Sequence, residues 1–483
     1  MHNPFDAVRE ALRAGKRSVA LQKATWDVPP PPAGAGACLR LEGLRGADID
    51  FGGGELRGRA ALRFFALADC EDVTIRNVVL DYWTPPFAQA EIVAADSGGV
   101  WTLRALAGYP APDESRLGEI WPMQVYGRES RELVNPMRSG DGFRLEKTGP
   151  GLYRATGGGN RAGAVGDIAV WNVFTAGGEA DLGGGAERNS VHLVRCRRCR
   201  FENVTAFATP GGRAFEEHSC EACEYVRCRV VRRSPDDDFA PREVPRLRSG
   251  GHDAFMSRRA VAGPRLDCCE ARYHCDDAVN VSGVFAVVSA VRGRRVRLVS
   301  ISASPFAPGD SAQVLGADGS IRPDRVVSSV AAAPAPASPE ERTLLRSIGL
   351  WPGLAEQSPA IPVELELADA GGIVLGDALI SDRAQGNGFA IRNCSFGHNR
   401  AFGMRIRASD GVIEGNVVED TEGWGLFIGP EYEWLEGGVS HDLLVRRNEF
   451  RRCGATLGGT AAFRRPLPPD AWRNVRFEDN VFS

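Results

Sequence analysis

The segments FAIRNCSFGHNR (389–400) and GVIEGNVVEDTEGWG (411–425) share one pattern. In each, a short run of alternating apolar residues reaches an asparagine, and a second short run follows. The two asparagines, Asn393 and Asn416, are 23 residues apart. Asparagine tolerates the left-handed backbone of a bend and hydrogen-bonds its own main chain. A repeat of roughly 20–30 residues built from short strands is typical of a solenoid.

The same frame occurs elsewhere in the chain, at Asn77, Asn203, Asn448 and Asn480. The intervals from Asn416 to Asn448 and from Asn448 to Asn480 are both 32 residues, as expected where a corner carries a longer loop. We therefore predict an all-β fold, a right-handed parallel β-helix with about three short strands per coil and stacked asparagine amides. Leucine-rich repeats are the main alternative, but their Leu-x-x-Leu-x-Leu frames are missing.

Two segments, residues 88–190 and 284–382, show alternation and Gly-Asp or Asp-Gly turns without the asparagine frame. Hairpins of this kind predict two small antiparallel β-barrels inserted between coils. The predicted organisation is an N-terminal cap with the first coils (1–87), a first barrel (88–190), central coils (191–283), a second barrel (284–382) and C-terminal coils (383–483). The cap is expected to contain a helix over residues 5–15, where Phe5, Val8 and Leu12 have helical spacing.

Composition narrows the class of protein. The 483 residues carry a formal charge of −4, which argues against a nucleic-acid binder. The apolar run at residues 284–291 is too short to cross a bilayer, so no membrane partner is expected. No apolar segment of a secretory signal is visible, which indicates a cytoplasmic protein as given, or a periplasmic or secreted one if a leader was removed. A homo-oligomer is compatible with these features.

The chain has 12 cysteines, four of them regularly spaced. Cys196 and Cys199 lie 24 residues before Cys220 and Cys223, respectively. This spacing matches a four-thiolate zinc site. A repeat of the same length would instead stack the small side chains as an internal ladder. The ladder is favoured over zinc, and disulfides are not expected in a chain without an export signal.

Three aspartates stand out in residues 249–283, SGGHDAFMSRRAVAGPRLDCCEARYHCDDAVNVSG. Asp253 precedes the adjacent pair Asp276 and Asp277 by about one coil. Because neighbouring coils stack about 4.8 Å apart, the three carboxylates are expected on one face. A glycosidase needs two carboxyl functions across the scissile bond, and three can supply one acid and two groups that hold the water. A solvated loop or a calcium site is the alternative.

At this point the sequence resembles glycoside hydrolase family 110, the exo-acting α-1,3-galactosidases. DDAVNVSG (276–283) resembles the family's Asp-Asp-Ala-x-Asn-x-x-Gly segment, and Asp253 falls where the family has its earlier catalytic carboxylate. LDYWTPPFAQAEIV (80–93) resembles the family's passage into an inserted barrel. NRAFGMRI (399–406) and EYEWLEGGVSHDLLVRRNEF (431–450) resemble its Asn-Arg-Ala and Trp-x-Glu-x-Gly segments. The family's β-helix carries two small β-barrels.

The resemblance implies removal of terminal α-1,3-linked galactose from a glycan, with inversion at the anomeric carbon and without a metal ion or cofactor. Asp276 would be the general acid, and Asp253 and Asp277 would activate the water. Candidate substrate contacts are Asn280, Arg405, Trp434 and Glu436. Aromatic rings stack on the apolar faces of sugars, and charged groups pair with hydroxyls.

Two departures from the family bear on the sugar. Ser282 stands where the family usually has a histidine, and TPGGRAFEEHS (209–219) brings Glu216, Glu217 and His218 into a segment that is more apolar in the family. A second hypothesis is therefore a β-helix glycosidase of another specificity, such as a galacturonidase. The basic residues that would favour it are Arg258, Arg259, Arg405 and Arg407.

A third hypothesis, from another class, is a non-catalytic glycan-binding β-helix protein. Binding alone does not require three carboxylates, which argues against it. A lyase or epimerase is less favoured, because no cluster of calcium ligands or Lys/Arg bases stands out in the sequence.

Overall fold

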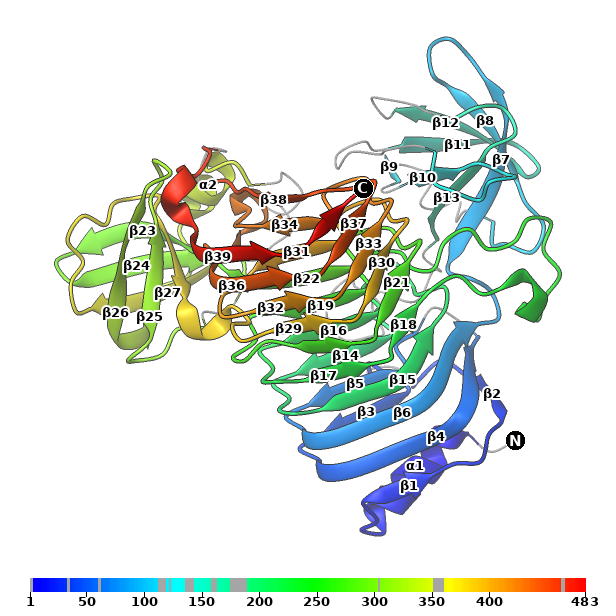
Figure 1. The fold of residues 1–483 in the computed structure, drawn as a ribbon, viewed down its shortest axis with the longest axis horizontal. Helices are drawn as coiled ribbons and strands as arrows, with labels where there is room; N and C mark the ends of the chain where they lie inside the picture. Colours follow the sequence, from blue (N-terminus) through cyan, green and yellow to red (C-terminus); the bar gives the residue numbers. More distant parts are fainter. Residues whose placement is uncertain are drawn as a thin grey trace.

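The chain forms a right-handed parallel β-helix with two insertions (Figure 1). The computed structural model describes residues 3–32, 35–59, 62–111, 119–120, 123–134, 143–157, 163–173, 189–302, 305–350, 360–461 and 465–483. Most coils contribute one strand to a ten-stranded sheet and two to a 17-stranded sheet, as β16, β17 and β18 do. The predicted fold class, with about three short strands per coil, is confirmed.

The 17-stranded sheet wraps two sides of the helix. Its strands are β1 (Ser18–Ala20), β2 (Thr25–Val28), β4 (Arg45–Gly58), β6 (Glu71–Tyr82), β15 (Arg200–Ala206), β17 (Glu224–Val226), β18 (Arg229–Val230), β20 (Arg265–Asp267), β21 (Glu270–Arg272), β29 (Ala390–Arg392), β30 (Ser395–Gly397), β32 (Val412–Glu414), β33 (Val417–Glu419), β36 (His441–Arg446), β37 (Glu449–Arg451), β39 (Arg473–Glu478) and β40 (Val481–Phe482). Short strands suffice because each pairs in parallel with the coils before and after it.

The ten-stranded sheet forms the remaining side. Its strands are β3 (Leu39–Glu42), β5 (Phe65–Ala68), β14 (Val191–Val194), β16 (Phe215–His218), β19 (Phe255–Arg258), β22 (Val279–Val284), β31 (Met404–Arg407), β34 (Leu426–Ile428) and β38 (Ala455–Leu457), with β35 (Glu436–Gly437) paired antiparallel to the end of β22. Side chains alternate along these strands, so one set faces the core and the next faces outward.

The first insertion lies between β6 and β14, at the upper right of Figure 1. Its described strands form one antiparallel sheet in the order β10-β13-β7-β8-β12-β11-β9. They are β7 (Phe87–Ala95), β8 (Trp101–Ala105), β9 (Glu119–Ile120), β10 (Met123–Tyr126), β11 (Phe143–Gly149), β12 (Leu152–Gly157) and β13 (Ile168–Asn172).

The second insertion, between β22 and β29, closes into a six-stranded barrel, as predicted. Its strands are β23 (Ala286–Arg292), β24 (Arg295–Ser300), β25 (Ser311–Leu315), β26 (Ile321–Ala332), β27 (Ile361–Leu367) and β28 (Ala378–Ser381). Helix α2 (Pro339–Ser347) lies between β26 and β27.

Four short 3-10 turns are also described: η2 (Pro235–Asp237), η3 (Asp382–Ala384), η4 (Tyr432–Trp434) and η6 (Pro469–Ala471).

The predicted N-terminal helix is present as α1 (Pro4–Arg13). The side chain of Asn3 caps it by accepting a hydrogen bond from the backbone N–H of Phe5 at 3.0 Å. Phe5 packs edge-on against Phe51 and Phe65, so α1 covers the apolar end of the first coils. Among the described residues, no helix is long and apolar enough to cross a membrane.

The asparagine pattern divides into two positions of the coil. Asn77, Asn203 and Asn393 have a left-handed backbone, and the amide of Asn203 donates to the side chain of Asn77 at 2.9 Å. Asn416 instead follows a left-handed glycine, and its side chain is buried. There, the N–H of Asn416 donates to Oδ1 of Asn448 at 3.0 Å, and the N–H of Asn448 donates to Oδ1 of Asn480 at 3.0 Å. The prediction that all the asparagines share one position of the coil was therefore wrong. Arginine, cysteine and glycine also occupy the left-handed position, so an asparagine does not mark it.

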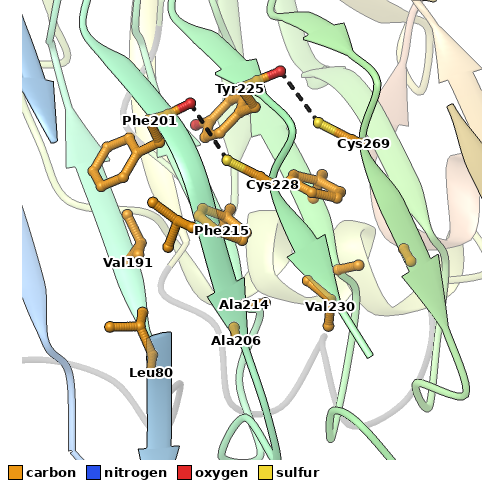
Figure 2. Close-up of a cluster of buried hydrophobic side chains, with 14 of the residues drawn as sticks. Leu80, Val191, Phe201, Ala206, Ala214, Phe215, Tyr225, Cys228, Val230 and Cys269 are labelled. Carbon is orange, nitrogen blue, oxygen red and sulfur yellow. Dashed lines mark hydrogen bonds between the residues drawn. The ribbon is translucent and has the colours of Figure 1, made fainter. Parts of the chain in front are cut away.

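Buried cysteines occupy the interior of the central coils (Figure 2). Cys228 donates to the carbonyl of Phe201 at 3.3 Å, and Cys269 donates to the carbonyl of Tyr225 at 3.2 Å. Cys196 and Cys220 meet across adjacent coils, where the N–H of Cys196 lies 3.4 Å from Sγ of Cys220. Among the described residues, the thiols of Cys196, Cys199, Cys220 and Cys223 do not all lie close enough together to share one metal ion. The arrangement is that of the ladder.

Candidate active site

The three aspartates lie where two strands of the ten-stranded sheet begin. Phe255 of β19 pairs with Val279 of β22, so the coil spacing here is 24 residues. This register aligns Asp253 with Asp277, and places His252 beside Asp276. The sequence-based spacing of 23 had aligned Asp253 with Asp276 instead. The one-residue difference decides which carboxylate is enclosed and which reaches the surface.

Asp253 is hydrogen-bonded to Asp277 and lies close to Asp276. Its Oδ1 accepts a hydrogen bond from the backbone N–H of Asp277 at 3.1 Å. One carboxylate oxygen of Asp253, one of Asp276 and a ring nitrogen of His252 all lie within 4.8 Å of one another. The structure thus brings the three predicted carboxylates together on one face of the β-helix.

Asp277 is the most enclosed of the three, at 1% exposed. Its Oδ1 accepts from the N–H of Phe402 at 3.1 Å, and its Oδ2 lies 3.2 Å from Arg405. Burial raises the pKa of Asp277; Arg405 opposes the rise and the adjacent Asp276 adds to it. Because both oxygens already have partners on the next coil, this side chain is fixed in place.

Asp276 is the most accessible carboxylate. Its side chain is 13% exposed, compared with 3% for the side chain of Asp253. Its Oδ1 lies 3.3 Å from the buried guanidinium of Arg400, and its Oδ2 lies 3.5 Å from Nδ1 of His252. Burial and Arg213 act against a positive charge on His252, but Asp253 and Asp276 outweigh them and raise its pKa.

A buried network of charges adjoins Asp277 on the next coil. Arg405 bridges Asp277 and Glu431, and Arg407 pairs with Glu431 and, at 3.2 Å, with Glu436. Burial alone would raise the pKa of Glu436, but Arg407 and three other arginines outweigh it and lower that pKa. Arg407 is fully buried, so its charge is balanced by these glutamates.

The four predicted substrate contacts differ in how they reach this network. Asn280 donates to Oδ2 of Asp277 at 3.4 Å and accepts from Arg407 at 3.2 Å. Arg405 and Glu436 belong to the network directly. Trp434 lies half-buried in η4. It is near the site because Glu431 and Glu436, on either side of it in the sequence, belong to the network. Its stacking on a sugar stays a prediction.

On the other side of Asp253, the two preceding coils carry polar groups, which we call the polar end: the buried Asn189, Arg213 and Glu216, and the partly exposed His218. Arg213 lies 3.6 Å from Asp253 and 3.9 Å from Glu216. His218 contacts the other side of Glu216 at 2.7 Å. Ser282, the departure noted in the sequence, is fully buried between Arg258 and Arg407 in the strand register.

Sequence reasoning missed His252, Arg213, Arg400 and Glu431. His252 and Arg213 occupy the coil positions of Asp276 and Asp253, so an exact repeat register would have found them. Arg400 and Glu431 sit in loops, for which a repeat gives no register.

The donors around the aspartates do not suit calcium, which takes 6–8 oxygen ligands. Oδ1 of Asp277 receives a backbone N–H, and guanidinium groups lie beside each aspartate. A divalent cation would have to displace these positive groups. The calcium alternative is therefore disfavoured by the donor set itself.

No protein-family model matches the chain. Its sequence is 22% identical, over 95% of this chain and 72% of the relative, to α-1,3-galactosidase B of Bacteroides thetaiotaomicron. The chain is thus similar to a curated glycosidase. α-1,3-Galactosidase A of the same organism is 31% identical over 72 residues, which cover 15% of this chain and 13% of that one.

Two solved structures also overlap with the fold. The A-module of the mannuronan C-5 epimerase AlgE4 from Azotobacter vinelandii gives a TM-score of 0.35 at 9% identity, covering 99% of this chain and 71% of that one. The tailspike of Pseudomonas phage LKA1 gives a TM-score of 0.22 at 9% identity, covering 94% and 56%. Both scores are below 0.5, so these overlaps support no functional conclusion.

Proposed function

We propose that the protein is an inverting glycoside hydrolase that removes terminal α-1,3-linked galactose from oligosaccharides or glycans. The observation that carries the proposal is the placement of Asp253, Asp276 and Asp277 together at the start of two adjacent strands. The similarity to α-1,3-galactosidase B over 95% of the chain supports the same reaction and sugar.

Accessibility distinguishes the roles of the carboxylates. A general acid must reach the glycosidic oxygen, and Asp276 is the most exposed of the three. Asp277 has both oxygens engaged by the next coil, which suits a group that holds and polarises the water. Asp253, bound to the N–H of Asp277, is the second group on the water. We therefore assign Asp276 as the acid, and Asp253 and Asp277 as the water-activating pair.

Inversion rests on the family resemblance and on the presence of two water-holding groups. Carboxyl groups stand about 6.5–9.5 Å apart in most inverting enzymes and about 5–5.5 Å apart in retaining ones. The nearest oxygens of Asp253 and Asp276 lie within 4.8 Å, which does not by itself favour inversion. The first-formed anomer is therefore the decisive measurement for this part of the proposal.

The charges around the site favour a neutral sugar over a uronide. A carboxylated sugar would require arginines whose charges are available to it. Arg405 and Arg407 are instead paired with Asp277, Glu431 and Glu436. Two of the four arginines that favoured a galacturonidase are thus engaged in internal ion pairs, which weakens that alternative.

Hydrolysis of p-nitrophenyl α-galactoside and of an α-1,3-linked galactose disaccharide, with the α-galacturonide as comparison, tests the proposal. We expect release of galactose and, in a proton NMR time course, β-galactose as the first anomer. Faster cleavage of the galacturonide would favour the second hypothesis. Saturable glycan binding without turnover would favour a binding protein.

A further inference from the structure

The face of the β-helix that carries the aspartates continues beyond them as three aromatic rings. We call Phe402, Trp424 and Phe427 the aromatic ledge. Phe402 lies two residues before β31, one coil beyond Asp277, and its N–H donates to that carboxylate at 3.1 Å. Trp424 is one coil further, where its carbonyl accepts from the N–H of Gly403 at 3.1 Å. Phe427 is the strand partner of Arg405.

Each ring of the ledge lies over a glycine. A β-carbon built on Gly454 would stand 2.9 Å from the indole of Trp424, and one on Gly423 would stand 3.0 Å from the ring of Phe402. A β-carbon on Gly458 would likewise stand 3.0 Å from the ring of Phe427. Because glycine has no side chain, each ring can pack directly against the backbone, and a β-carbon at these positions would crowd it. Trp424 nevertheless remains 48% exposed.

The ledge is continuous with the charged site. The guanidinium of Arg405 lies 4.5 Å from the ring centre of Phe402, and the same group contacts Asp277 at 3.2 Å. The rings of Phe402 and Phe427 are 5.4 Å apart. Trp424 lies two coils from Asp277, a distance of about 10 Å along the helix axis at the usual strand spacing.

The two ends of the face differ in kind. At the polar end, Arg213 is 7% exposed, and Glu216 and Asn189 are 1% and 2% exposed. Apart from His218, whose side chain is 22% exposed, that end is closed and offers hydrogen bonds. The ledge end is apolar and, at Trp424, half open. An enzyme that removes one terminal sugar needs a closed end for that sugar and an open end for the remainder of the chain.

We infer that the aromatic ledge binds the aglycone, by stacking a pyranose ring of the glycan that remains after galactose is removed. This inference rests on the proposed function. It also sets the direction of the substrate, with the terminal galactose toward the polar end and the remaining sugars toward Trp424. Sugar C–H groups pack against an exposed indole face much as apolar side chains do.

The experiment compares two substrates that differ only beyond the cleaved bond. α-Galactosyl fluoride has no aglycone ring, whereas a trisaccharide ending in α-1,3-linked galactose extends over the ledge. In Trp424→Ala, we expect the ratio of kcat/KM for the trisaccharide to that for the fluoride to fall roughly three- to tenfold. Trp424→Phe keeps a stacking ring and should recover most of the ratio. Trp83→Ala, which removes another exposed tryptophan far down the helix, should keep the wild-type ratio.

An unchanged ratio in Trp424→Ala would overturn the inference while leaving the proposed function intact. An equal fall for both substrates would place Trp424 against the galactose or in the fold, and would also overturn it. If the wild type turns over neither substrate, the proposed function fails and the inference fails with it.

Discussion

The backbone N–H of Asp277 donates a hydrogen bond to Oδ1 of Asp253 at 3.1 Å, across two coils of the β-helix. The same contact recurs one step along the stack, where the N–H of Phe402 donates to Oδ1 of Asp277. It also recurs below, where the N–H of Arg213 donates to Oδ1 of Asn189 at 2.9 Å. Asp253 and Asp277 therefore each use one oxygen to join adjacent coils, in addition to their proposed role on the water.

This double role predicts that asparagine and alanine will separate structure from catalysis at position 253. Asp253→Asn keeps an oxygen for the N–H of Asp277, as Asn189 does naturally for Arg213. Asp253→Ala leaves that buried N–H without a partner and should lower the free energy of unfolding by a further ~1–3 kcal/mol. Both variants should lose activity. Urea denaturation of the two proteins measures the difference, and equal stability would show that the contact contributes nothing.

Asp276→Asn should abolish turnover with little change in stability. The side chain is the most exposed of the three, and the amide keeps its size while losing the transferable proton. We expect a loss of about 10³-fold or more in kcat, because the asparagine amide has no proton to give to the glycosidic oxygen. Asp236→Asn, at an exposed aspartate of η2, is the matched control. Wild-type rates in Asp276→Asn would remove the acid assignment.

Glu217 should make the protein less stable as the pH rises. Burial raises its pKa to about 7, against hydrogen bonds from Ser257 and Tyr225 that favour the charged form. Since the folded state holds the proton more tightly than the unfolded state, this contribution to stability is complete below about pH 4.5. It is lost as the pH rises towards 7, by about 3 kcal/mol in total.

Denaturation at pH 5 and pH 8 tests this effect against Glu217→Gln, which keeps an amide in place of the protonated acid. The wild type should lose more stability than the variant between the two pH values. A parallel loss in both proteins would mean that another group is responsible.

Arg407→Met should destabilise the protein strongly, because it leaves Glu431 and Glu436 buried without their shared partner. Breaking a buried ion pair costs about 3–5 kcal/mol. Adding Glu436→Gln to Arg407→Met should recover part of that loss, since one uncompensated charge is removed. A double-mutant cycle by chemical denaturation measures the coupling. Strictly additive single effects would contradict the network.

The fold was predictable because the coil repeats its apolar pattern, whereas the register was not. The left-handed bend accepts Asn203 and Asn393 but equally Arg227 and Cys268, so no single residue type marks it. Counting from the asparagines therefore gave the period without the alignment of individual side chains.

The same limit explains what could be predicted of the site. Asp253, Asp276 and Asp277 could be predicted because three carboxylates about one coil apart match what a glycosidase requires. His252 became part of the site only once the 24-residue register was known. Arg405 and its partner Glu431 come from coils beyond the second insertion, and only the closed β-helix brings Arg405 beside Asp277.

That separation has a consequence for synthesis on the ribosome. Phe402, whose N–H holds the carboxylate of Asp277, follows it by 125 residues, with the second barrel in between. At about 5–20 residues per second, Asp277 waits roughly 6–25 s for its partner to be translated. A nascent chain will therefore expose its paired acids until the next coil docks. Nascent chains arrested before residue 402 should be inactive, however well their first coils have folded.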